Sequence, residues 1–126
     1  MSAALAASPR DAVLFALLTL EDVPLAWQLA HSLNLESDDV WERLAARYET
    51  VDATAVLPVL ARLAQHGLVQ ADAHHYRLGA RRLAKMRRLT HGTSAAADVD
   101  QLIADLRATH RRRPRLQQEF DRAGLP

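Results

Sequence analysis

A chain of 126 residues, 49% of them apolar, is long enough for one hydrophobic core with an appended helix, which excludes a wholly disordered protein. The formal net charge is +1, but residues 1–50 hold 3 basic and 8 acidic side chains while residues 51–126 hold 13 basic and 7 acidic ones, so a polyanion should approach the second part. The absence of cysteine excludes disulfides and thiol catalysis, and the longest apolar run, Ala12 to Leu18, is far below the ~20 residues that cross a bilayer, so we expect a cytoplasmic protein.

The first predicted helix begins at Ser8, because this capping residue is followed by Pro9 at the first helical position and by an acid at Asp11. It extends to about Leu20 and is apolar on nearly every side. Such a helix must be covered on more than one side, so a core helix of a monomer and a helix shared between two chains are both open. Residues 1–7 lack the basic start and long apolar stretch of a secretory signal.

Two further helices are predicted before residue 50. Residues 22–24 start the first of them, and Ser37 caps the second, whose first turn carries acids that the helix dipole favours. The helix from Ser37 to Glu49 is either an insertion or the support helix of a helix-turn-helix. The second alternative, which we prefer, makes Val51 a very short first strand.

The stretch from Asp52 to Leu78 organises the prediction. Asp52 caps a helix with an inward apolar ladder, and Gly67 ends it. Leu68 and Val69 then begin a strand pattern that polar residues interrupt and residues 76–78 resume, which is typical of a β-hairpin. A helix followed by a hairpin is the ending of a winged helix. The inward ladder consists of Val56, Leu60, Leu63 and Ala64.

The same stretch resembles a known family. Residues 52–69, DATAVLPVLARLAQHGLV, are similar to the recognition helix of PadR-like winged-helix transcriptional regulators, and LFALL at 14–18 with PLAWQLA at 24–30 resembles that family's first two helices. The resemblance implies a mostly α winged helix-turn-helix with a two-stranded β-hairpin wing and an appended C-terminal helix. It gives a winged-helix domain at residues 8–90, a C-terminal helical dimerisation segment at residues 95–123, and double-stranded DNA as partner.

DNA reading requires hydrogen-bond donors on the outward face of the recognition helix. At about 100° per residue this outward face is Thr54, Leu57, Pro58, Ala61, Arg62 and Gln65. The family usually has an aromatic residue at Leu57 and often a basic one at Ala61, and this chain has neither. Such an apolar face also suits a protein partner. The wing would add His74, His75 and Arg77.

Basic residues dominate the helix predicted for residues 79–90. They are Arg81, Arg82, Lys85, Arg87 and Arg88. Phosphate contact by Arg81, Arg82 and Arg88 and plain solvation of a charged face are equally open. Gly92 ends this helix.

A last helix is predicted from about Ala95 to His110, with an apolar stripe at Val99, Leu102, Ile103 and Leu106. The resemblance implies that this stripe joins two subunits of a homodimer, and the alternative is packing on its own domain. Pro114 is expected to kink or end the helix, and the arginines at 111–115 are interpreted as a solvated tail.

The sequence favours no enzyme class, because it contains no glycine-rich phosphate loop, no Gly-x-Ser-x-Gly turn and no His-Glu-x-x-His pair. Adjacent histidines in a strand would point to opposite faces, so no metal or cofactor is expected. We therefore predict a DNA-binding transcriptional regulator, in particular a repressor. The alternative is a winged-helix module that binds a protein without sequence-specific DNA binding.

Overall fold

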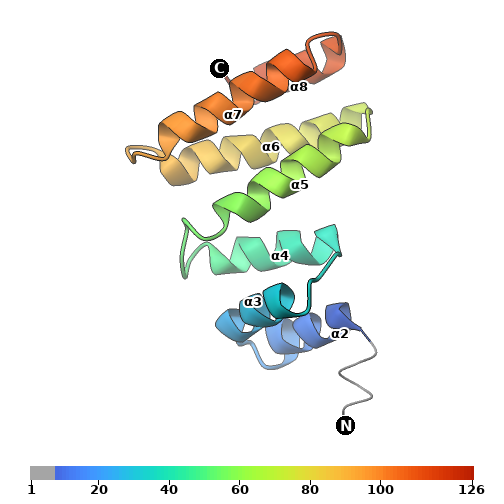
Figure 1. Cartoon of the computed structure of the whole chain (residues 1–126), viewed down its shortest axis with the longest axis vertical. Helices are drawn as coiled ribbons and strands as arrows, with labels where there is room; N and C mark the ends of the chain where they lie inside the picture. The colour runs from blue at the N-terminus through green and yellow to red at the C-terminus, as the bar shows by residue number, and fades with distance from the viewer. Residues whose placement is uncertain (1–7) are drawn as a thin grey trace. The chain divides into compact units, whose positions relative to one another are not determined.

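The computed structural model describes residues 8–126, and most of these residues are helical (Figure 1). The helices, with η1 as a π-helical turn, are α2 (Pro9–Leu14), η1 (Phe15–Thr19), α3 (Val23–Ser32), α4 (Asp38–Tyr48), α5 (Leu57–Val69), α6 (Ala73–Thr90), α7 (Ala96–Thr109) and α8 (Pro114–Arg122). No strand occurs between residues 8 and 126, so the predicted wing is wrong, and the winged helix-turn-helix fold class is wrong with it. The expected absence of a signal at residues 1–7 lies outside the described residues.

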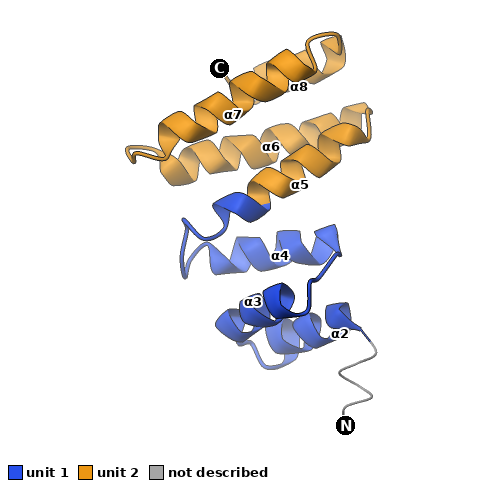
Figure 2. Cartoon of the chain, viewed as in Figure 1, with its two compact units in different colours: residues 1–59 blue, residues 60–126 orange. Residues whose placement is uncertain are grey.

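The chain divides into two compact units, residues 1–59 (unit 1) and residues 60–126 (unit 2), as Figure 2 shows. Unit 1 contains α2, η1, α3 and α4, and unit 2 contains α6, α7 and α8 with most of α5. The division of residues 8–90 from residues 95–123 stays a prediction, and its gap coincides with the turn between α6 and α7.

In unit 1, α3 packs against α2, η1 and α4. The predicted cap at Ser8 is confirmed, because its hydroxyl accepts a hydrogen bond from the Asp11 amide at 3.3 Å. Ser37 stands at the N-cap of α4 as predicted, but its side chain makes no capping hydrogen bond. The Asp22 carboxylate caps α3 by accepting from the Leu25 amide at 3.1 Å. The first helix changes to a π-turn at Phe15, where the Leu20 amide donates to the Phe15 carbonyl at 3.0 Å.

Aromatic rings reinforce the packing of α3 against α4. The buried Trp41 Nε1 donates to the Leu35 carbonyl at 2.6 Å, so its polar atom is satisfied. The Trp27 ring stacks on the Tyr48 ring with centroids 4.2 Å apart. Val51 is an exposed turn residue and forms no strand, which corrects the predicted first strand.

The stretch predicted as recognition helix and wing forms two helices instead. The Asp52 carboxylate accepts from the Thr54 and Ala55 amides at 3.1 and 3.2 Å, which holds a turn, and α5 begins only at Leu57. The helix then runs through Gly67 to Val69. Residues 70–72 separate α5 from α6, and residues 73–78 are the start of α6.

The physical reason for this correction is the N-cap of α6. The Asp72 carboxylate accepts from the His75 amide at 2.9 Å and so starts a helix where a hairpin turn was predicted. Tyr76, Ala80 and Leu83 then recur at helical spacing and are all buried. Two short apolar runs separated by polar residues fit a hairpin and a helical hairpin equally well.

In unit 2, α6 packs against both α7 and α8. Its contact with α5 is close, since a Cβ on Gly79 would lie 3.0 Å from the Leu68 side chain. Pro114 begins α8 instead of ending a helix, and Leu116 and Phe120, which follow the arginines predicted as a tail, are fully buried in it. No helix in residues 8–126 combines the length and apolarity needed to cross a membrane.

Candidate nucleic-acid interface

The helix α6 carries the candidate site, and its sequence explains its length of 18 residues. Asp72 caps its start, and arginine, alanine, leucine, lysine and methionine, which are strong helix formers, fill its middle. The pKa of Asp72 lies below its ordinary value because the His75 amide and then the His75 side chain stabilise the ionised carboxylate.

One face of α6 is basic and exposed. At about 100° per residue, Arg77, Arg81 and Arg88 lie within about 40° of one another around the helix axis. All three side chains are exposed, and Arg81 and Arg88 have no ion-pair partner among residues 8–126. Arg81 and Arg88 therefore give this face positive charge that no carboxylate of residues 8–126 neutralises.

Beside this face lies a cluster of charges around one buried carboxylate, which we call the Glu119 cluster and which consists of Glu119, Arg77, Arg115 and Arg122. The Glu119 side chain is only 2% exposed. Its Oε1 lies 3.7 Å from the Arg77 Nε, and its Oε2 lies 3.2 Å from the Arg115 Nε and 3.3 Å from an Arg122 terminal nitrogen. Three guanidinium groups thus share one carboxylate, and the cluster has a net charge of +2.

Two other arginines of unit 2 bond to backbone carbonyls. The half-buried Arg82, predicted as a DNA contact, donates from a terminal nitrogen to the Leu63 carbonyl at 3.0 Å. Arg113 donates to the Leu68 carbonyl at 3.2 Å. Burial, and secondly the neighbouring Arg113, lower the pKa of His110, which favours its neutral form.

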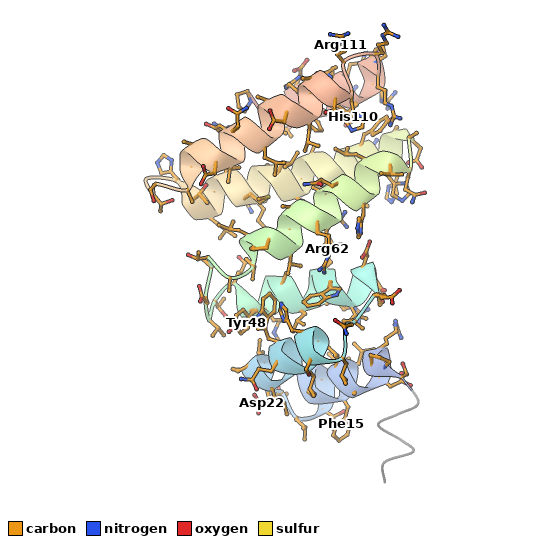
Figure 3. The ribbon with its side chains drawn as sticks, in the orientation of Figure 1. Phe15, Asp22, Tyr48, Arg62, His110 and Arg111 are labelled. Carbon is orange, nitrogen blue, oxygen red and sulfur yellow. The ribbon has the colours of Figure 1, made fainter. Side chains whose placement is uncertain are left out.

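The predicted reading face lies on α5 and on the turn before it. Pro58, Arg62 and Gln65 are exposed there, and so is Thr54 in the turn, but Leu57 and Ala61 are half-buried. Figure 3 labels Arg62 on α5. The predicted inward ladder of Val56, Leu60, Leu63 and Ala64 is confirmed, because all four side chains are buried.

The predicted wing residues occupy the first turn of α6 and not a strand. His74 is exposed, and His75 lies with its Nδ1 2.7 Å from the Asp72 carboxylate. Arg77 is part of the Glu119 cluster. Among residues 8–126, no three histidine, aspartate or glutamate side chains are grouped so that they could hold a metal ion.

The predicted dimerisation stripe lies on α7, which packs on α6. Val99, Ile103 and Leu106 are buried within the single chain, and Leu102 is half-buried. Dimerisation through this stripe stays a prediction.

Sequence analysis missed Glu119 and Arg122 and assigned Arg115 to a solvated tail. The signal for the α8 part was present, because positions 115, 119 and 122 are spaced to lie on one face of a helix. The participation of Arg77 had no such signal, since 42 residues separate it from Glu119.

No family model, no curated protein and no solved structure matches this chain. The resemblance to PadR-like regulators stays a prediction, and a functional assignment must rest on the residues described above.

Proposed function

We propose that the protein binds double-stranded DNA through unit 2. The contacts would be made by a basic surface that consists of Arg77, Arg81, Arg88, Arg115 and Arg122. The observation that supports this proposal most is the Glu119 cluster, in which three arginines share one carboxylate beside two unpaired arginines of α6.

The charge of the whole unit supports the same proposal. Unit 2 holds 13 basic and 6 acidic side chains, a net charge of +7, whereas the whole chain has +1. Arginine forks suit phosphate geometry, and a surface of this charge attracts a polyanion over several ångströms. Contacts to phosphates carry no base information, so the affinity should differ little between duplex sequences. A role in transcription regulation is what the resemblance implies, and it stays a prediction.

The proposal is tested by titrating the full chain with a fluorescent random duplex at two salt concentrations. Five phosphate contacts give a salt slope of about −4.5, so the affinity should fall by about 10²- to 10³-fold between ~50 and ~200 mM salt. No binding at ~50 mM salt would refute the proposal, and binding without salt dependence would show that arginines do not make the contacts.

A second candidate function is self-association or protein binding through unit 1. Its support is a group of exposed apolar side chains at and just after η1, where Phe15 is 55%, Leu18 55% and Leu20 52% exposed (Figure 3 labels Phe15). If this surface joins two copies, sedimentation should show a dimer that the double variant Phe15→Ser, Leu18→Ser converts to a monomer. A monomeric parent chain would exclude this arrangement.

A further inference from the structure

We propose that the Glu119 cluster is a binding site for a phosphomonoester dianion. This inference rests on the DNA binding proposed above. On DNA, a phosphomonoester dianion is the 5′-terminal phosphate of a strand. Internal phosphates would meet the rest of the basic surface.

The first observation behind this site is the orientation of the arginines. Arg77 and Arg115 both direct their Nε atoms at the carboxylate of Glu119. Their terminal nitrogens have no hydrogen-bond partner among residues 8–126, and the two side chains are about half exposed. Each guanidinium therefore keeps donors available for a second anion while the buried carboxylate holds it in place.

The second observation is the burial of Glu119, which orders the arginines around it. Arg77 approaches one of its oxygens, and Arg115 and Arg122 approach the other. The three cations come from two helices that pack against each other, α6 and α8. They are ordered before any ligand arrives, so less side-chain entropy is lost when an anion binds.

The net charge of the cluster selects the ligand. Three guanidinium groups and one carboxylate leave +2 at the site. An internal phosphodiester carries one negative charge, whereas a phosphomonoester carries about −1.5 to −2 at pH 7. Only the monoester matches the charge of the site, so a strand end with a 5′-phosphate should bind more tightly than the same end with a 5′-hydroxyl.

The test compares two duplexes of identical sequence, one with 5′-phosphates and one with 5′-hydroxyls, by fluorescence anisotropy at ~100 mM salt. We expect the phosphorylated duplex to bind the full chain at least about fivefold more tightly, because each of the roughly two negative charges that a 5′-phosphate adds contributes about that factor at ~5 Å in a water-like dielectric. Equal affinity would overturn this inference and leave the proposed function intact. Loss of binding to both duplexes would instead refute the proposed function.

A matched pair of variants assigns the preference to this cluster. The double variant Arg115→Gln, Arg122→Gln should lose the preference for the phosphorylated duplex. The control, Arg111→Gln with Arg112→Gln, removes the same charge from two exposed arginines before α8 (Figure 3 labels Arg111). This control should keep the preference for the phosphorylated duplex. Loss of the preference in both variants would show that total charge alone causes it, which overturns the assignment.

Two further measurements do not depend on DNA binding or on the folding of the glutamine variant. A titration with thymidine 5′-monophosphate, followed through the arginine Nε–H resonances, should shift those of Arg77 and Arg115, and thymidine should not. The double variant Arg115→Lys, Arg122→Lys keeps the charge but removes the planar guanidinium groups, which can bind a phosphate through two hydrogen bonds. It should therefore bind the monophosphate less tightly than the parent chain. Unshifted resonances, or unchanged affinity in the lysine variant, would contradict a built site.

Discussion

The two units of this chain have opposite charge and different exposed chemistry. Unit 1 holds 3 basic and 9 acidic side chains, a net charge of −6, and both tryptophans of the chain. Unit 2 has a net charge of +7 and presents arginines on α6 and α8. The overall net charge of +1 conceals this separation. The average charge of the chain therefore does not show that its basic residues are concentrated in unit 2.

The difference extends to how each unit uses its arginines. In unit 1, Arg10 lies 3.3 Å from Asp39, and that carboxylate also accepts a hydrogen bond from the Ser37 hydroxyl. The Ser37 hydroxyl, and secondly Arg10, lower the pKa of Asp39. Here one arginine pairs with one carboxylate, in a unit that has more acidic than basic side chains. In unit 2 one acid, Glu119, meets three cations. Only the second arrangement leaves positive charge for a polyanion.

The largest effect is expected from charge reversal on α6. The double variant Arg81→Glu, Arg88→Glu should weaken duplex binding by about 10³-fold at ~50 mM salt, because two phosphate contacts are lost and two repulsions added. The matched variant Arg43→Glu, Arg47→Glu in unit 1 should change the affinity by less than about threefold. Equal losses in the two variants, measured by anisotropy, would abolish the distinction between the units.

The next effect concerns the core of unit 1, which the tryptophans report. Leu44 on α4 is fully buried, so Leu44→Ala should lower the free energy of unfolding by about 3 kcal/mol. Leu33→Ala, at a partly exposed leucine just after α3, should cost under about 1 kcal/mol. Urea unfolding followed by tryptophan fluorescence measures both. A cost for Leu33→Ala as large as that for Leu44→Ala would contradict the packing of this unit.

A smaller effect is expected at the buried carboxylate of unit 2. Glu119→Gln removes the charge that holds three arginines and leaves a buried amide among them, which should cost about 2 kcal/mol of unfolding free energy. Asp98→Asn, at an exposed acid in the first turn of α7, should change stability by less than about 0.5 kcal/mol. Urea unfolding followed by circular dichroism would show a stable Glu119→Gln variant if the cluster had no structural role.

The smallest effect is expected at the cap of α6. Asp72→Ala should lower the melting temperature by a few degrees at pH 7, since the His75 amide loses its acceptor, and Asp72→Asn should lose less. The pKa of Asp72 in the folded chain lies below 3.8, so its contribution is present above about pH 4 and is lost as the pH falls through the folded value. A difference between parent and Asp72→Ala that stays constant from pH 7 to pH 3, measured by thermal unfolding, would contradict an ionised cap.

Local signals in the sequence predicted much of the helical content. Ser8 caps a helix as expected, a helix starts within residues 22–24 as predicted, and the break around Gly92 lies where it was predicted, with a positive φ of 77°. These features depend on a few neighbouring residues. The two runs around Asp72 were ambiguous because an apolar pair, a polar gap and a second apolar run fit a β-hairpin and a helical hairpin alike.

The candidate site was harder to predict because it depends on long-range packing. Pro114 gives the same local signal whether it ends one helix or begins the next, and only its position at the start of α8 turns Arg115 and Arg122 to one face. The burial of Glu119 arises from the packing of α8 on α6, which no periodicity encodes. The basic residues of α6 were found from the sequence, but Glu119, the acid that Arg77 shares with two arginines of α8, was not.

The most direct measurement is a backbone amide NMR titration of the isotopically labelled full chain with a short random duplex. The shifts should concentrate on α6 and α8, around Arg77, Arg81, Arg88, Arg115 and Arg122, and should be small on α2, α3 and α4. Shifts concentrated on Thr54, Arg62 and Gln65, or on unit 1, would contradict the assignment of DNA binding to the basic surface of unit 2.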